Sequence, residues 1–391
     1  TENPDLSFAI LLAVTVYTFF AITEPLFFTH RTGFAIMERF AVLGLVGLAL
    51  TLCIIAGEID LSIGSNAALA AVITVRFTDD WGAINALLVA VAISTSIGAI
   101  QGYFIAYLRI RAIVLTVGTL MLLRGVALFA AEEKTVMLTD FRIPDFISTK
   151  MLGYFSPASL LVIGMFIVVG LFMTFTRYGR EIYAIGGARK EALASGISLQ
   201  RPMIIVFAIS GLCAGLGGAI IGLRSGTAQA LGLQYLLLAG TVAAFIGGVS
   251  ILGGKGGVIG AAIGTLTVNF LNTGLVFNVT PAFMVQLYLG ILLLVVILKE
   301  LMYRYMFRTG RSLSSTSLEA DAWHHRSDAI TSALAAVGIA IALWGGPDFV
   351  AADNWAALAA CVVIGWNALR LLRPALDEVM DAAVSSDKVD E

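Results

Sequence analysis

Gly57-Glu58-Ile59-Asp60-Leu61-Ser62-Ile63-Gly64-Ser65 is a polar stretch between two apolar segments, 40–57 and 62–78, and each segment could enter a bilayer. The stretch carries two carboxylates and two hydroxyls beside these segments. Ionisable groups are costly in a membrane, so they mark functional positions by default. The first expectation is a membrane protein with a functional site near Asp60.

The composition of the chain supports this expectation. Of 391 residues, 59% are hydrophobic and 13% charged, and the mean hydropathy is +0.94. So few charged side chains could not cover the apolar surface of a soluble domain. Apolar segments of about 20 residues recur, which is the length that a helix needs to cross a bilayer, and the short alternating strands of a membrane barrel are absent from the pattern. The sequence therefore predicts an all-α integral membrane protein.

Hydropathy predicts about ten transmembrane helices and two more near the C-terminus, with boundaries that are soft by several residues. The ten predicted spans are 7–28, 40–57, 62–78, 83–108, 110–131, 157–176, 202–223, 231–251, 256–277 and 282–304. The two further spans are 324–345 and 355–372.

Several functions are disfavoured by the sequence. The net charge of −2 provides no basic field, so nucleic acid is not an expected partner. Cys53, Cys213 and Cys361 lie in separate apolar spans without metal or disulfide spacing. The glycine-rich run 253–257 lacks the Ser or Thr that follows the lysine of a phosphate loop. No ATP site is therefore expected in this chain.

The segment 177–201 is the longest internal polar segment with a clear basic bias. Basic residues accumulate in short cytoplasmic loops, so we expect this segment in the cytoplasm. Counting spans outward from it places both termini in the cytoplasm as well. Arg31, Arg39 and Lys150 oppose the count, because it places them outside.

Within this basic segment, the sequence predicts a short amphipathic helix that begins near Lys190 and is closed by Gly196. Such a helix could lie on the cytoplasmic surface and present one face to another protein. The alternative interpretation is a plain basic loop that only orients the protein in the membrane.

Asp60 allows two interpretations, which are compatible. It could lie in a polar turn that lines a translocation path, or Asp60 or Ser62 could cap the helix that starts near Ile63. A hydroxyl-rich solute needs paired donors and acceptors, so further polar residues are candidates for the path, although each could equally form an interhelical hydrogen bond. These candidates are Ser62, Ser65, Asn66, Thr116, Asn269 and Asn272.

Four ordered segments carry a family resemblance. The nonapeptide 57–65 resembles the Ile-Asp-Leu-Ser-Val-Gly signature of ATP-binding cassette (ABC) importer permeases of the ribose type, and 178–197 resembles the coupling loop of the same family. The segments 113–120 and 247–256 resemble two further family segments. The resemblance covers about residues 1–308, and it implies a permease for ribose, xylose, rhamnose, galactose or autoinducer-2.

The resemblance also implies partners for this chain. It implies a cytoplasmic ATPase that carries the ATP, an extracytoplasmic sugar-binding protein, and a second permease copy in a homo- or heterodimer. The permease itself would contact the lipid of a bacterial inner membrane. This chain would be a transporter subunit that binds no cofactor and catalyses no reaction. The residues that match the coupling loop are Gly187, Arg189, Lys190, Glu191, Ala192 and Gly196.

The segment beyond the permease resembles a different family. After a linker at 309–323, His324 and Asp328 are four residues apart, a spacing that lets two side chains on one helix face share a cation. The segment 324–381, which precedes a polar tail at 382–391, resembles the last two transmembrane helices of cation diffusion facilitators. The two ligands that this family draws from an earlier helix are missing, which leaves half a zinc site.

Three explanations of the C-terminal segment stay open. It could be a fusion that only packs against the permease, it could bind zinc weakly, or His324 could simply lie at the membrane interface. For the whole chain we expect a monosaccharide importer subunit. The alternatives are a divalent cation (zinc) transporter or metal-responsive membrane protein, and a membrane scaffold that transports nothing.

Overall fold

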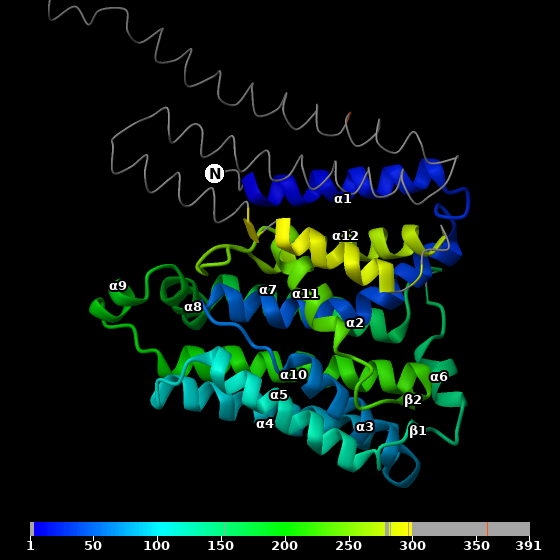
Figure 1. Cartoon of the computed structure of the whole chain (residues 1–391), viewed down its shortest axis with the longest axis horizontal. Helices are drawn as coiled ribbons and strands as arrows, with labels where there is room; N and C mark the ends of the chain where they lie inside the picture. The colour runs from blue at the N-terminus through cyan, green and yellow to red at the C-terminus, as the bar shows by residue number, and fades with distance from the viewer. Residues whose placement is uncertain are drawn as a thin grey trace, which may run out of the picture. The chain divides into compact units, whose positions relative to one another are not determined.

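The computed structural model describes residues 4–151, 153–277 and 283–295, and the single residues 281, 297, 298 and 358. Its contacts divide the chain into two units, Thr1–Leu289 and Gly290–Glu391. The fold of the first unit consists almost entirely of helices (Figure 1).

Seven helices in the described part of the chain are long and apolar enough to cross a membrane. They are α1 (Pro4–Thr23), α2 (His30–Ile55), α4 (Ala83–Tyr107), α5 (Ala112–Ala130), α7 (Pro157–Phe175), α10 (Gln200–Ser225) and α12 (Val258–Phe277). A further long helix, α3 (Ile63–Trp81), lies at a predicted span, but Arg76, Asp79 and Asp80 near its end make it more polar. The predicted class, a helical multi-pass membrane protein, is confirmed.

Three predicted spans have different bounds in the structure. The span predicted at 7–28 ends at Thr23, because residues 25–28 form turns. The span predicted at 40–57 begins ten residues earlier, at His30, because Glu38 and Arg39 are accommodated inside the helix by polar partners. The span predicted at 231–251 is wrong in length: α11 (Tyr235–Ile246) has 12 residues, or about 18 Å. The residues before it, 229–234, form turns instead of helix.

Shorter elements connect the long helices. They are α6 (Arg142–Ile147), α8 (Arg177–Gly187), α9 (Arg189–Ala194), and the antiparallel two-residue strands β1 (Val136–Met137) and β2 (Thr227–Ala228). The last predicted permease span is described as a helix over Phe283–Val295. The two C-terminal spans, 324–345 and 355–372, lie outside the described residues except for residue 358, so the total of ten plus two stays a prediction.

The centre of the unit is α10, which packs against α2, α3 and α4. Glycines permit this close packing, because a Cβ at Gly211 would meet the Ser94 carbonyl of α4 and one at Gly218 would meet the Ala67 carbonyl of α3. Small residues allow helices to approach where lipid provides no hydrophobic drive for association. The second group of packed helices is α1, α2, α11 and α12.

Candidate functional site

The predicted amphipathic helix is present as α9, Arg189–Ala194, directly after α8. Ala192 is buried, whereas Lys190 and Glu191 are exposed and Leu193 is 48% exposed. One turn of helix therefore presents a basic, an acidic and an apolar side chain outward.

Gly196 ends this helix in the manner that the sequence predicts. Its φ is +83°, a left-handed conformation that glycine adopts without strain. The Gly196 N–H donates to the Leu193 carbonyl and the Ile197 N–H to the Ala192 carbonyl. This pair of bonds is a Schellman motif, which terminates the helix and satisfies its last carbonyls.

Arg189 connects α9 to the polar stretch after α2. Its Nη1 lies 2.7 Å from Oε1 of Glu58. The backbone around this ion pair is closely packed, since the Gly254 N–H donates to the Ile55 carbonyl at 2.8 Å and Gly186 lies against the same carbonyl. Gly187, another predicted coupling residue, lies against Gly254. Three segments, at 55–58, 186–189 and 254, thus meet at one end of the unit.

The helix before α9 is fastened to the same end. The Tyr183 hydroxyl donates to the Gly256 carbonyl at 3.0 Å, and burial raises the pKa of Tyr183. Arg177 forms an i,i+4 ion pair with Glu181 at 2.6 Å, and this hydrogen bond raises the pKa of the Arg177 guanidinium. The Tyr183 bond holds α8 against the 253–257 loop, and the Arg177–Glu181 pair stabilises α8 itself.

A cavity of about 740 Å³ lies beside α9, between this helix and the loop that joins α4 to α5. Arg109, Arg111 and Arg189 line it together with one acidic residue, Glu58. Arg109 has φ +55°, an uncommon conformation for a residue other than glycine. The cavity is therefore a basic recess next to the exposed face of α9.

Asp60 lies deeper in the protein and is 2% exposed. Its Oδ1 accepts hydrogen bonds from the Ser62 N–H at 2.9 Å and the Ser62 hydroxyl at 2.6 Å, and its Oδ2 accepts one from the Ser210 hydroxyl at 2.9 Å. The Gln101 amide donates to the Ser62 hydroxyl at 2.9 Å. This cluster joins the start of α3 to α4 and α10.

The predicted helix cap is confirmed in its position along the chain, but the side-chain hydrogen bond of a cap is absent at Ser62. Ser62 occupies the N-cap position of α3, but its side chain makes no capping bond and donates to Asp60 instead. The other candidates nearby are also buried: Ser65, Asn66, whose amide donates to the Ser94 carbonyl at 3.3 Å, and Thr116, whose hydroxyl donates to the Ile59 carbonyl at 3.5 Å.

The structure separates the two candidates on α12 from this cluster. Asn269 is 2% exposed and its side-chain nitrogen has no partner among the described residues. Asn272 accepts a hydrogen bond from Arg39 at 3.0 Å. Since α12 packs against α1, α2, α7 and α11, the seven candidates do not form one surface. His324 and Asp328 lie outside the described residues.

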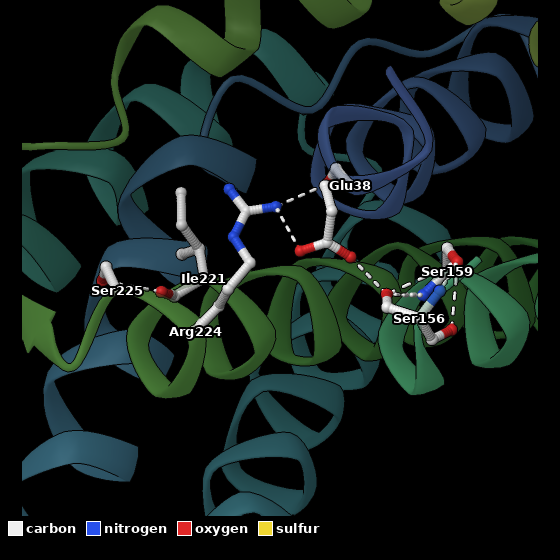
Figure 2. A network of polar contacts seen from close by, with 6 residues as sticks. All are labelled: Glu38, Ser156, Ser159, Ile221, Arg224 and Ser225. Carbon is white, nitrogen blue, oxygen red and sulfur yellow. Dashed lines mark hydrogen bonds and ion pairs between the residues drawn. The ribbon is translucent and has the colours of Figure 1, made fainter. Parts of the chain in front are cut away.

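Sequence reasoning missed a buried ionic network toward the opposite end of α2 and α10 (Figure 2). Arg224 Nη1 donates to the Glu38 carbonyl at 2.6 Å and lies 3.6 Å from the Glu38 carboxylate, which also accepts from the Ser156 hydroxyl. Ser156 caps α7 together with Ser159. The signal for this network was available, because Glu38 and Arg224 adjoin apolar runs in which an isolated charge would be costly.

Sequence comparison identifies two family models that match the chain. The model described as "Branched-chain amino acid transport system / permease component" matches residues 33–297. The model described as "Cation efflux transmembrane domain" matches residues 241–380, which include the C-terminal segment and overlap the first match.

Individual relatives agree with the first match. The chain is 30% identical to the D-allose transport system permease protein AlsC of Escherichia coli (strain K12), over 68% of this chain and 82% of that protein. It is 32% identical to the ribose import permease protein RbsC of the same strain, over 64% and 80%. It is 30% identical to the autoinducer 2 import system permease protein LsrD of Escherichia coli O157:H7, over 75% and 90%. No solved structure matches the chain.

Proposed function

The chain belongs to the family of the permease components of branched-chain amino acid transport systems, and from that premise we propose that it is the transmembrane permease subunit of an ATP-driven ABC importer for a monosaccharide. The names of three relatives support a sugar or a similar polyol, in the class of ribose, xylose, rhamnose, galactose and autoinducer-2, over an amino acid.

The observation that carries this proposal is the construction of the α8–α9 end. The exposed side chains of α9 and the basic recess beside it offer a surface for a cytoplasmic ATPase, which binds and hydrolyses the ATP. The recess, with three arginines and one carboxylate, favours an acidic group on the partner, whereas the exposed Glu191 of α9 favours a basic one. The predicted coupling residues Lys190 and Glu191 would touch the ATPase, whereas Arg189 would connect the helix to the permease.

A displacement of α9 would reach the transmembrane helices through two connections. One is the ion pair between Arg189 and Glu58, two residues before Asp60. The other is the glycine contact of α8 with the end of α2. ATP binding and release would then bias the helix packing between outward and inward access, since packed interfaces favour discrete arrangements.

The buried cluster at Asp60 contributes to this transmission. Its three accepted hydrogen bonds occupy the carboxylate within one subunit, so we assign Asp60 and Ser62 a positioning role for α3 and α10. Ser65, Asn66 and Thr116 beside this cluster are proposed for the solute path, and Asn269 and Asn272 are proposed for a separate part of it on α12.

The remaining partners follow from the same proposal. A soluble sugar-binding protein would deliver the solute from outside, and a second permease copy, identical or related, would complete the pore. The complex would lie in a bacterial inner membrane with both termini of this chain in the cytoplasm. Lys and Arg in the segment 177–201 support that orientation.

Copurification followed by identification of the partners tests this proposal. We expect an ATPase and an extracytoplasmic binding protein to be recovered with the chain. Glu191→Lys should reduce recovery of the ATPase and the uptake per ATP hydrolysed. Asp145→Lys, an exposed reversal on α6 at the other end, is the matched control and should change neither. Unchanged uptake and recovery in Glu191→Lys would contradict the assignment.

A second candidate function, divalent cation binding, rests on the cation efflux match at 241–380. His324 and Asp328 would supply two ligands, which is half of a tetrahedral site, so we propose weak zinc binding at most. Equilibrium dialysis of the purified chain with ⁶⁵Zn²⁺, compared with His324→Ala, tests it. Equal binding by both proteins would exclude a role for His324.

A further inference from the structure

The chain between β2 and α11 returns into the helical unit without forming a helix. At its start, β2 pairs with β1, which follows α5, and the Leu138 N–H donates to the Gly226 carbonyl. At its end, Leu233 and Gln234 lie against Gly64 in the first turn of α3. Between these points Ala230 packs with Leu69, so the segment 229–234 runs along the first two turns of α3. Figure 1 shows the chain turning back from β2 before α11 begins.

This segment, 229–234, is exposed on one side. Leu231 is 44% exposed, Gly232 and Gln234 are exposed, and Tyr235 at the start of α11 is 45% exposed. Lipid cannot satisfy the polar groups of a non-helical backbone. Such backbone occurs at membrane depth only where protein buries it or where it lines a water-filled cavity. The exposed side of 229–234 therefore favours contact with water or with another protein over contact with lipid.

Arg124 provides an independent observation in the same region. It lies on α5 nearly two turns before Ala130, and within the described residues its guanidinium has no hydrogen bond or ion pair. Its neighbours Leu123 and Ala127 pack with Ala230 in one apolar cluster. Charged side chains in spanning helices face the bundle interior or an aqueous cavity. Because Leu123, the sequence neighbour of Arg124, packs with Ala230, these contacts favour an aqueous cavity beside the 229–234 segment.

We propose that Arg124 and residues 229–235 form the solute-recognition wall of the translocation path, open in one subunit and closed by the second permease copy. The wall would take a neutral, hydroxyl-rich solute. Arg124 would donate two parallel hydrogen bonds to adjacent hydroxyls, the Gln234 amide would donate and accept one each, and the Tyr235 ring would pack on the apolar face of the sugar.

The inference rests on the proposed sugar import. The competing source of acceptors for Arg124 is a lipid phosphate, because the side chain could extend along the last turns of α5 to the membrane interface. A lipid contact would leave Arg124 unnecessary for uptake, and this consequence separates the two cases.

Thiol accessibility tests the water-filled wall. In a variant that lacks Cys53, Cys213 and Cys361 and retains uptake, Leu231→Cys is compared with Val168→Cys, because Val168 is a 61% exposed apolar residue in the middle of α7. A charged thiol reagent should modify position 231, and Gln234→Cys, at least about tenfold faster than position 168, since the reactive thiolate requires water. Slow modification at both 231 and 234 would overturn the proposal.

Uptake measurements test recognition by Arg124, with labelled D-ribose and D-allose as probes and the intact complex in proteoliposomes. Arg124→Met should reduce the maximal uptake rate by about tenfold, the loss expected for a charge-assisted hydrogen bond. Arg124→Lys should give an intermediate rate because it keeps the charge and loses the planar fork. Arg76→Met, at an arginine paired with Glu132, is the control. In all three variants, assembly of the complex and its ATP hydrolysis in the absence of sugar should not change.

The outcomes separate the inference from the proposed function. If the unmodified complex imports neither these nor related sugars, the proposed function fails and solute recognition fails with it. If the unmodified complex imports sugar and the Arg124→Met complex does so at the same rate, only the inference is overturned. A difference in stability between these two complexes in anionic lipid would then assign Arg124 to a lipid phosphate.

Discussion

Arg189 and Glu58 are 131 positions apart in the sequence, yet their side chains meet at 2.7 Å. The carboxylate is mostly shielded, with 12% of the side chain exposed, and the guanidinium is 42% exposed. The contact joins the helix proposed to receive the ATPase to the polar turn that precedes α3. It is therefore a direct side-chain connection from α9 to that turn.

Exchange of the two charges tests this connection. Glu58→Arg and Arg189→Glu should each lower sugar uptake per ATP hydrolysed, because each places two like charges in contact. The double variant should recover much of the coupling. Stability should change by less than about 1 kcal/mol, because the pair is partly exposed. Uptake and ATP hydrolysis measured together check this, and equal uncoupling in the double variant would exclude a direct role for the contact.

Asp60 provides a prediction on stability. Asp60→Ala leaves the donors of Ser62 and Ser210 buried without an acceptor, which should cost about 2–4 kcal/mol. Asp60→Asn retains one oxygen acceptor and should lose less. Thermal unfolding in detergent measures both, with Ser195→Ala as an exposed control. A larger loss for asparagine than for alanine would contradict the hydrogen-bond assignment.

The packing of α10 on α3 predicts a contrast between two glycines. Gly218→Ala places a Cβ against the Ala67 carbonyl and should destabilise the protein by about 1–3 kcal/mol. Gly164→Ala in α7 meets nothing within 4 Å, so it should be neutral or stabilise the helix by up to about 1 kcal/mol. Membrane abundance and unfolding temperature compare the two. Equal effects would mean that helix propensity, and not contact with α3, decides them.

Local patterns were sufficient to predict much of this fold. The lengths of the apolar segments predicted α4, α5 and α7 to within two residues of their bounds, and Gly196 predicted the end of α9. Two features were not local. Glu38 and Arg39 continue α2 because each has a distant polar partner. Arg224 is 186 positions from Glu38, and Asn272 is 233 positions from Arg39. No hydropathy window contains such partners.

The candidate site shows the same division. The sequence indicated that Asp60 and Ser62 belong to a polar turn, but their bonds to Ser210 and Gln101 depend on the packing of α10 and α4. The turns at 229–234 also escaped prediction, because an apolar segment returning beside α3 has the same hydropathy as a spanning helix.

Removal of residues 312–391 tests the role of the C-terminal segment. We expect sugar uptake to stay largely intact, since the permease match ends at residue 297. Zinc binding, where present, should be lost together with His324. Uptake and membrane abundance are measured on the same preparation. A complete loss of uptake at normal abundance would show that this segment is part of the importer.

The most direct test of the account is the side of the membrane on which α9 lies. Glu191→Cys, in the variant without other cysteines, is exposed to a membrane-impermeant thiol reagent in inverted and in right-side-out vesicles. The account predicts modification in inverted vesicles and protection when the ATPase is bound. Modification in right-side-out vesicles would place α9 outside the cell and contradict the coupling surface.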